Sequence, residues 1–366
     1  MTRQIENSNG HVGGGRTSRR ANQRRVTMTD VAREAGCSQA TVSFVLNQSP
    51  GIKLSPQTRD RVYDAARRLG YAAPFGNARM QLPGTSGRRR IGFLVDQLAA
   101  SPEAAVAIEG AGLAARANGD LLLVSQTFND PATEADLVRD FVGHGVSALV
   151  YMSIFTREIE LSAHLLDLDI PVFLLNCYTT GQSHPAVVPS EIAGGQRSTR
   201  HLIDQGHRRI AIITGEIWME AAQDRIKGYR RALATADIPF DPALVVEGDW
   251  SASAGYAATR KLLDLPNRPT AIFCQNDRMA IGCYEALKEA GLDIPRDMSV
   301  VGYDDEEISR HMHPALTTSI LPHRAMGQWI IEQIGEMTGP PGGRYPITKL
   351  ECPLVERLSV APPKVL

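Results

Sequence analysis

The stretch that most constrains the fold is Val26–Asn47, which reads VTMTDVAREAGCSQATVSFVLN. Its pattern predicts two short helices joined by a tight turn. Thr27 or Thr29 can cap the first helix, because a threonine hydroxyl accepts a hydrogen bond from a free backbone N–H. Gly36 ends that helix, since a residue without a Cβ adopts the left-handed conformation at the lowest cost. With Ser38 as the cap of the second helix, the sequence predicts a compact helix-turn-helix.

A third helix is expected to follow, with Ser55 as its cap, Pro56 in its first turn and Gly70 at its end. On all three helices the apolar residues recur at helical spacing, which gives each helix an inward face. These inward residues are Val31, Ala32, Ala35, Val42, Val45, Leu46, Val62, Ala65, Ala66 and Leu69. Three such helices in about 45 residues are the plan of a DNA-reading head, expected over residues 26–72, whose second helix enters the major groove.

The distribution of charge favours a DNA-reading head over the alternative, a three-helix fragment of a larger all-helical core. The formal net charge is −1, yet residues 1–90 hold 16 Lys and Arg against 5 Asp and Glu, a net of +11, which leaves −12 on the remainder. Positive charge concentrated on a small head is what contact with DNA phosphates requires. Arginines lie before the first helix and on the third: Arg19, Arg20, Arg24, Arg25, Arg59, Arg61, Arg67 and Arg68.

The second helix leaves small and polar side chains facing outward or at its N-terminal tip. Gln39 can bond the edge of an adenine bidentately, whereas Ala40 and Phe44 offer only apolar contact, as with a thymine methyl group. Phe44 is interpreted equally well as a surface aromatic packed on the third helix. The residues of the head expected to contact DNA are Thr29, Ser38, Gln39, Ala40, Thr41, Ser43, Phe44, Asn47 and Arg59.

Residues 91–366 alternate short apolar runs with helical stretches, which is typical of parallel sheets covered by helices on both faces. The expected strands are Ile91–Val95, Leu121–Val124, Ala148–Met152, Val172–Leu175, Ile210–Ile213, Leu244–Val246, Ala271–Cys274 and Ser299–Gly302. The expected helices include Ala104–Ala117, Gly194–Gln205, Arg225–Thr235 and Met279–Ala290. The sequence therefore predicts an α/β body of two lobes, with the first crossing between them near Val188–Ala193.

Ligands of such sheets bind beyond the carboxyl ends of the strands, so a cleft between the lobes is the expected ligand site. Asp304 follows the predicted strand that ends in VVGY, and Asn276–Asp277 follow AIFCQ. Asp277 is expected to cap the following helix, and a cap is also the alternative role of Asp304. In the first lobe, Asp96 or Gln97 and Asn176 follow strands in the same way and are weaker candidates.

Several other classes of protein are disfavoured. The chain has no run of about 18 apolar residues, so no membrane span is expected, and residues 1–25 are polar and glycine-rich, which predicts a disordered basic arm without a secretion signal. Five scattered cysteines without CxxC pairs suit reduced thiols in a cytoplasm. No nucleophile elbow, Walker loop or HExxH motif is present, so neither enzyme activity nor a cofactor is expected. His311 and His313 are interpreted as loop residues and not as metal ligands.

The segment TMTDVAREAGCSQATVSFVLN resembles the N-terminal signature of the lactose-repressor (LacI/GalR) family of bacterial transcription regulators. The resemblance covers about residues 26–360, with matching segments at Ser55–Tyr71, His201–Gly215, Arg225–Leu233, Pro269–Glu307 and Pro314–Ile320. It implies a body like a periplasmic binding protein, and dimers or tetramers whose affinity for DNA changes when a small molecule, usually a sugar or a nucleobase, binds that body.

The same resemblance implies roles for individual residues of the body. Asn276 and Asp304 match positions that contact polyhydroxylated ligands, Arg225 matches an arginine that reaches into the cleft, and Trp250 matches an aromatic that stacks on sugars. Carboxylate, amide and guanidinium groups together suit adjacent sugar hydroxyls. The alternatives are that Trp250 belongs to the core of a lobe, and that Arg225 pairs on the surface with Asp224 or Glu220. The expected effector-binding residues are Asp96, Asn176, Arg225, Trp250, Asn276 and Asp304.

Two positions depart from the family pattern. Phe44 stands where the second helix often carries a base-reading Arg or His. After Tyr71 the family has a hinge helix that wedges a leucine into the minor groove, and here Met80 or Leu82 is the candidate wedge within a hinge and linker expected over residues 73–90. Met80 is therefore added to the expected DNA contacts.

The leading hypothesis is a cytoplasmic, ligand-responsive repressor of carbohydrate-uptake or catabolic genes, which binds a pseudo-palindromic operator in double-stranded DNA as a homodimer. The Gly- and Pro-rich C-terminal region has no heptad run, which favours a dimer over a tetramer. The alternatives are a solute-binding module without DNA regulation, a regulator of the same class that responds to a nucleobase or a phosphosugar, and an enzyme on a doubly wound fold.

Overall fold

The structure, a computed structural model, describes residues 26–46, 54–69, 88–99, 102–337 and 343–364. The chain divides into two compact units, Met1–Gly87 and Arg88–Leu366. The predicted arm over residues 1–25 and most of the predicted hinge and linker, with Asn47 and Met80, lie outside the described residues. In the described part of the chain, no helix has both the length and the apolar character needed to cross a membrane.

The first unit contains the predicted helix-turn-helix, formed by α1 (Met28–Ala35), α2 (Gln39–Leu46) and α3 (Pro56–Leu69). Thr27, and not Thr29, caps α1, in a reciprocal arrangement in which the Asp30 carboxylate accepts from the Thr27 backbone N–H. Gly36 ends α1 in the left-handed conformation, with a φ of 62°. Ser38 and Ser55 accept hydrogen bonds from the backbone N–H groups three residues later, as the sequence predicts for the caps of α2 and α3.

The core of this head is the predicted inward set. Eight of its members are buried: Val31, Ala32, Ala35, Val42, Val45, Val62, Ala65 and Ala66. Leu69 is half-buried against them, and the Leu46 side chain lies outside the described part. The Tyr63 hydroxyl donates a hydrogen bond to the Val45 carbonyl oxygen at 3.2 Å and so ties α3 to α2.

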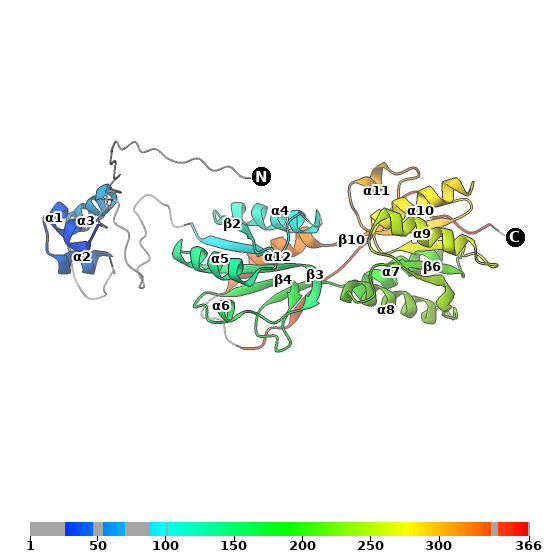
Figure 1. The fold of residues 1–366 in the computed structure, drawn as a ribbon, viewed down its shortest axis with the longest axis horizontal. Helices are drawn as coiled ribbons and strands as arrows, with labels where there is room; N and C mark the ends of the chain where they lie inside the picture. Colours follow the sequence, from blue (N-terminus) through cyan, green and yellow to red (C-terminus); the bar gives the residue numbers. More distant parts are fainter. Residues whose placement is uncertain (1–25, 47–53, 70–87, 100–101, 338–342, 365–366) are drawn as a thin grey trace, which may run out of the picture. The chain divides into compact units, whose positions relative to one another are not determined.

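The first lobe of the second unit is built on a parallel sheet with the strand order β11-β5-β4-β3-β1-β2. Figure 1 labels β2, β3 and β4 of this sheet. Its strands are β1 (Arg90–Val95), β2 (Leu121–Gln126), β3 (Ala148–Glu158), β4 (Val172–Tyr178), β5 (Ala186–Pro189) and β11 (Ile347–Leu350). One face is covered by α4 (Pro102–Ala117) and α12 (His323–Glu336), and the other by α5 (Pro131–Gly143) and α6 (Ala163–Leu166).

The second lobe repeats this plan with the strand order β12-β10-β9-β8-β6-β7, in which only β12 runs antiparallel among the strands described. Its strands are β6 (Ile210–Thr214), β7 (Val245–Glu247), β8 (Ala271–Cys274), β9 (Ser299–Asp304), β10 (Thr317–Ile320) and β12 (Leu354–Val355). Its helices are α7 (Glu191–Asp204) and α8 (Glu220–Thr235) on one face, α9 (Ala252–Leu263) and α10 (Asp277–Glu289) on the other, and the short α11 (Ile308–His311) after β9.

The chain passes between the two lobes three times. It leaves the first sheet after Pro189, inside the predicted crossing region, returns between β10 and α12, and leaves again between β11 and β12. All eight predicted strands are present, whereas β5, β10, β11 and β12 are additions to the prediction. In each sheet the strand order reverses next to the first strand of the lobe, which places a ligand crevice at the carboxyl ends of the strands.

Candidate functional site

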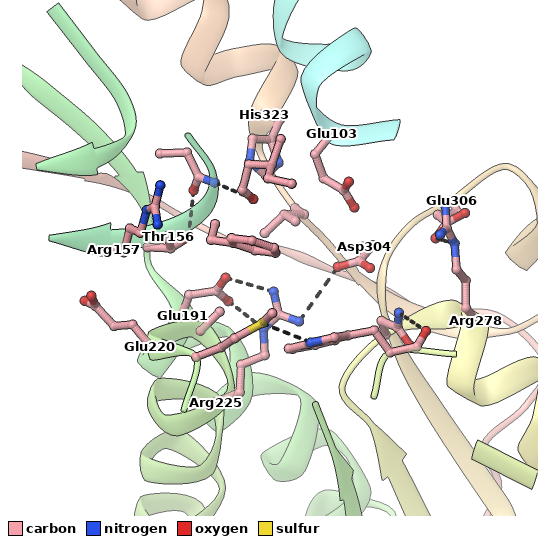
Figure 2. Close-up of a pocket in the computed structure, with 18 of the residues that line it drawn as sticks. Glu103, Thr156, Arg157, Glu191, Glu220, Arg225, Arg278, Asp304, Glu306 and His323 are labelled. Carbon is pink, nitrogen blue, oxygen red and sulfur yellow. Dashed lines mark hydrogen bonds and ion pairs between the residues drawn. The ribbon is translucent and has the colours of Figure 1, made fainter. Parts of the chain in front are cut away.

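A cavity of about 410 Å³ lies between the two lobes of the second unit (Figure 2). Its walls are the carboxyl ends of strands and the first turns of the helices that follow them. Five of the six predicted effector-binding residues line it: Asn176, Arg225, Trp250, Asn276 and Asp304. A volume of this size is in the usual range for small-molecule sites, about 300–1,000 Å³.

Arg225, on α8, lies on the floor of this cavity and is only 3% exposed. It donates to both carboxylate oxygens of Glu191, at 2.7 and 2.8 Å, and to the carbonyl oxygen of Gln275. Its guanidinium also stacks on Tyr303, with Cζ 3.8 Å from the ring centroid. The alternative of a surface pair with Asp224 or Glu220 is wrong, because the helix turns Arg225 inward to Glu191 at the start of α7.

Asp304 ends β9 and faces the same space. Its φ of 107° is in a region that non-glycine residues rarely adopt, and such strain is kept where the surrounding structure enforces it. Burial raises the pKa of the Asp304 carboxyl well above its ordinary value. Its Oδ1 lies 3.8 Å from the Arg225 guanidinium, yet it has no hydrogen-bond partner in the part of the chain that the structure describes.

Trp250 and Asn276 support each other at the second-lobe side of the cavity. The Asn276 amide donates to the Trp250 carbonyl oxygen at 3.0 Å, and the Trp250 indole N–H points to the Met219 sulfur at 3.0 Å. The indole lies on Gly215, where an added Cβ would come within 1.9 Å of the ring. Trp250 therefore packs against the core of its lobe and also lines the cavity, where stacking on a ligand stays a prediction.

The cap of α10 is Asn276 and not Asp277, which corrects the sequence prediction. The Asn276 side chain accepts from the Met279 backbone N–H at 2.8 Å. Asp277 is instead buried beneath the site, where it accepts hydrogen bonds from the Thr318 hydroxyl and the Glu306 backbone N–H. Burial raises the pKa of Asp277 to about 7.

Asp96 does not line the cavity, although the sequence places it at the end of β1. Its carboxylate is buried and accepts from the Ser153 hydroxyl and the Ile154 backbone N–H, both at 2.9 Å. These bonds hold an irregularity in β3, where the pairing with β4 shifts between Met152 and Arg157. Asn176 bonds the other side of the same irregularity, through the carbonyl oxygens of Ser153 and Ile154.

Further lining residues were not expected from the sequence. Phe155, from the β3 irregularity, meets Trp218 of the other lobe edge to face, with ring centroids 5.9 Å apart. Glu103, Glu191 and His323 lie in the first turns of α4, α7 and α12, and Arg278 and Glu306 pair at 3.0 Å. The rule that helix starts after strands face the ligand could have identified Glu103 and Glu191.

Buried polar atoms without hydrogen-bond partners gather in this cavity. Within the described residues they are Glu103 Oε2, Arg157 Nε, Asp304 Oδ1 and both ring nitrogens of His323. Such groups are rare in folded proteins, because leaving a buried donor or acceptor unpaired costs about 1–3 kcal/mol. Their concentration in one cavity indicates a site for a polar ligand.

The candidate DNA surface lies on the first unit. Gln39 and Ala40 are exposed at the start of α2, and Phe44 is 39% exposed and is not among the side chains packed on the head core. Thr29, Ser38 and Arg59 are also exposed, whereas Thr41 and Ser43 are half-buried. The described residues contain no group of three His, Cys, Asp or Glu side chains that could hold a metal, and all five cysteines are free.

Comparison with known proteins assigns both units. Residues 27–73 match the family model for bacterial regulatory proteins of the lacI family, and residues 199–360 match a periplasmic binding protein-like domain. The chain is 31% identical to the ribose operon repressor of Haemophilus influenzae and 32% identical to the HTH-type transcriptional repressor PurR of Vibrio cholerae. Each alignment covers 91% of this chain and 98% of the relative.

Among solved structures, the lac repressor dimer bound to operator and the anti-inducer ONPF is 28% identical, with a TM-score of 0.64. That match covers 92% of this chain and 99% of the other. The match to one family thus runs through the head and both lobes. The chain belongs to the lacI family of bacterial regulatory proteins: it is a DNA-binding transcriptional repressor with an effector-binding domain, and not an enzyme.

Proposed function

We propose that this repressor controls carbohydrate-uptake or catabolic genes in the cytoplasm, in response to a small sugar-like effector bound between its lobes. The observation that carries the proposal is the cavity in which Glu103, Asp304 and His323 hold buried polar atoms without partners among the described residues. A polyhydroxylated ring offers several donors and acceptors at close spacing, which these atoms require. The indole of Trp250 supplies an apolar wall for the face of such a ring.

The charges of the cavity disfavour a phosphosugar. Two of its three guanidinium groups are hydrogen-bonded to carboxylates, Arg225 to Glu191 and Arg278 to Glu306, and the third, Arg157, lies 3.6 Å from Asp96 with its Nε unpaired among the described residues. A phosphate group would add negative charge to a site where Glu103 and Asp304 already lack a hydrogen-bond donor within the described chain. A nucleobase is the second candidate, because aromatic side chains line the cavity and PurR is among the similar proteins.

We also propose that α2 of the head reads a pseudo-palindromic operator. Gln39, Ala40 and Phe44 would contact base edges, while Thr29, Ser38, Thr41, Ser43 and Arg59 would contact the backbone and fix the register. The basic head supports this role because phosphate contacts dominate the affinity of proteins for DNA. Asn47 and the hinge residue Met80 complete the proposed surface from outside the described residues.

A symmetric operator needs two heads, so we propose a homodimer. The exposed edge of the first sheet supports it, because strand β2 carries Leu121 and Val124 with much of their apolar surface uncovered, and Leu98, Leu113 and Phe128 are exposed nearby in the sequence. An unpaired apolar edge strand invites association with another chain. The lac repressor structure similar to this chain is a dimer.

A thermal-shift screen of the full chain tests the effector assignment. We expect hexoses or pentoses to raise the unfolding temperature of the second unit, and Asp304→Ala to remove that rise. Asp293→Ala, which changes an exposed carboxylate far from the cavity lining, is the matched control and should keep the rise. Stabilisation by purine bases alone would show that the nucleobase candidate is right and the sugar candidate wrong.

A further inference from the structure

An acidic wall crosses the cavity from one lobe to the other. It consists of Glu103 in the first turn of α4, from the first lobe, and of Asp304 and Glu306 after β9, from the second lobe (Figure 2). Burial raises the pKa of both Asp304 and Glu306; Arg225 and Arg278 oppose this rise, and the negative charge of Glu103 adds to it. Two lobes thus present like charges to each other at one side of the cavity.

The cations of the cavity do not balance this wall. The lining residues include five carboxylates, Glu103, Glu191, Glu220, Asp304 and Glu306, but only three guanidinium groups, Arg157, Arg225 and Arg278. Arg225 is held by Glu191 through two hydrogen bonds and lies 3.8 Å from Asp304, Arg278 pairs with Glu306, and Arg157 is nearest to Asp96. Glu103 is the member of the wall without a cation partner among the described residues. Glu103 Oε2 and Asp304 Oδ1 remain buried without a donor in the described chain.

His323 provides a third acceptor at the same wall. It is 2% exposed, and neither of its ring nitrogens has a partner among the described residues. Burial lowers the pKa of this imidazole. The neutral form of the ring offers one nitrogen as an acceptor and one N–H as a donor. Glu103 lies near His323 in Figure 2, at the upper side of the cavity.

Three unpartnered acceptors around one region of excess negative charge match the three N–H donors of a primary ammonium group. A neutral hydroxyl would supply one hydrogen bond but no charge, and would leave the Glu103 carboxylate without a counter-charge, which is unfavourable in a desolvated site. The rings of Phe155, Trp218 and Trp250 line the same cavity, and aromatic faces attract a desolvated cation.

We propose that the effector is a polyhydroxylated ring bearing a protonated primary amine, such as an amino sugar, with its ammonium group held between Glu103, Asp304 and His323. The inference rests on the proposed function, since it specifies the class of sugar-like molecule that the cavity takes. Because Glu103 and Asp304 come from different lobes, the ammonium group would replace a repulsion between the lobes with an attraction.

Calorimetric titration of the full chain with matched pairs tests the inference. The pairs are D-glucosamine with D-glucose, and D-galactosamine with D-galactose, and the N-acetyl derivative of each amine serves as a probe in which the charge is removed. We expect the amine of at least one pair to bind at least about tenfold more tightly than its hydroxyl counterpart, as hydrogen bonds to charged groups allow. N-acetylation should abolish that advantage.

A substitution in the acidic wall tests whether this wall causes the preference for the amine. Glu103→Gln should lower the preference for the amine by about tenfold and leave the affinity for the neutral sugar nearly unchanged. Glu109→Gln is the matched control, since Glu109 lies on the same helix and forms an exposed pair with Arg324. Thermal unfolding of both variants without sugar confirms that each is folded.

Two results would overturn the inference while leaving the proposed function intact: equal or tighter binding of the neutral sugar in every pair, or an amine preference that survives Glu103→Gln. Binding of purine bases with no response to any sugar would contradict the proposed function, and the inference with it.

Discussion

At the scale of single residues, the buried pair of Arg225 and Glu191 is central to the effector cavity. Both side chains are 3% exposed, and the carboxylate is the partner that neutralises the guanidinium. Two charges taken out of water are stable only together, because either of them alone would remain buried without compensation. The pair also joins the first turn of α7 to α8 and holds the Arg225 guanidinium 3.8 Å from Asp304.

Glu191→Gln should lower the free energy of unfolding of the second unit by about 3–5 kcal/mol, since it removes the carboxylate that accepts two hydrogen bonds from a buried cation. Urea denaturation followed by tryptophan fluorescence measures this change, because all three tryptophans, Trp218, Trp250 and Trp329, belong to that unit. Glu351→Gln, which removes the exposed partner of Arg197, is the control and should cost at most about 1 kcal/mol. Equal effects of the two variants would contradict the role of the buried pair.

Residue types at strand ends predicted Asn176, Asn276 and Asp304, whereas Arg225 and Trp250 were expected from the resemblance to the lacI family. Asn176, Arg225, Trp250, Asn276 and Asp304 all reach the cavity. Asp96 meets the same criterion but turns to the backbone of β3, because the irregularity of that strand leaves N–H groups that need an acceptor. That irregularity has no signature in the sequence, and His323 is brought to the site by a crossing between lobes that follows β10, a strand outside the prediction.

At the scale of elements, three pairs of helices pack through glycines at their contacts. The pairs are α4 with α12, α7 with α8, and α9 with α10, with glycines Gly110, Gly327, Gly195, Gly228, Gly255 and Gly282. At each of these positions an added Cβ would lie within 2.5 Å of a backbone oxygen of the partner helix. The helix axes therefore lie closer than side chains would allow, and α4 presents Glu103 to the cavity from one of these pairs.

Gly110→Ala should destabilise the second unit by about 1–3 kcal/mol, because the added Cβ would lie 2.1 Å from the Arg324 carbonyl oxygen. The backbone of α12 can relieve this clash only if the two helices α4 and α12 move apart. Gly112→Ala on the same helix would bring its Cβ into ordinary contact with Leu122 Cδ2 at 4.0 Å and should be stabilising by up to about 1 kcal/mol. The same fluorescence-monitored denaturation measures both. A Gly110→Ala protein as stable as the parent would refute the close packing.

Apolar runs predicted eight strands because buried parallel strands read as continuous hydrophobic segments. Three of the strands that were not predicted, β10, β11 and β12, lack this signal, whereas β5 carries it in the short buried run AVVP, which the prediction missed. β10 has the sequence TTSI and is buried through hydroxyl side chains that bond within the lobe, and β11 and β12 are edge strands with half-exposed side chains. The helix-turn-helix was predictable nearly to the residue, since its caps and its inward face are local features.

At the scale of the whole molecule, a basic head is joined to an acidic body that carries the effector cavity and the proposed dimer surface. A dimer matters for function because two heads on one site bind as a unit, and each half-site then raises the effective concentration of the other head. We propose that two copies of the chain associate through the edge strand β2 of the body.

Leu121→Glu should weaken the dimer by at least about tenfold, because it places a charge on the apolar edge that a second copy would cover. Leu121 is 41% exposed, so the folded monomer tolerates the change. Sedimentation velocity measures the association. Leu166→Glu on α6, at a 56% exposed leucine of the same lobe, is the control, and a dimer equally stable in both variants would show that β2 is not the interface.

The central claim is that the head reads a DNA site, and selection of duplex DNA from a random pool by the full chain tests it most directly. The predicted result is one sequence made of two inverted half-sites, bound with an affinity that falls steeply as the salt concentration rises. The Gln39→Ala variant should select different bases within each half-site. Recovered sequences with no shared half-site, or the same half-site selected by the parent and by Gln39→Ala, would contradict the reading role assigned to α2.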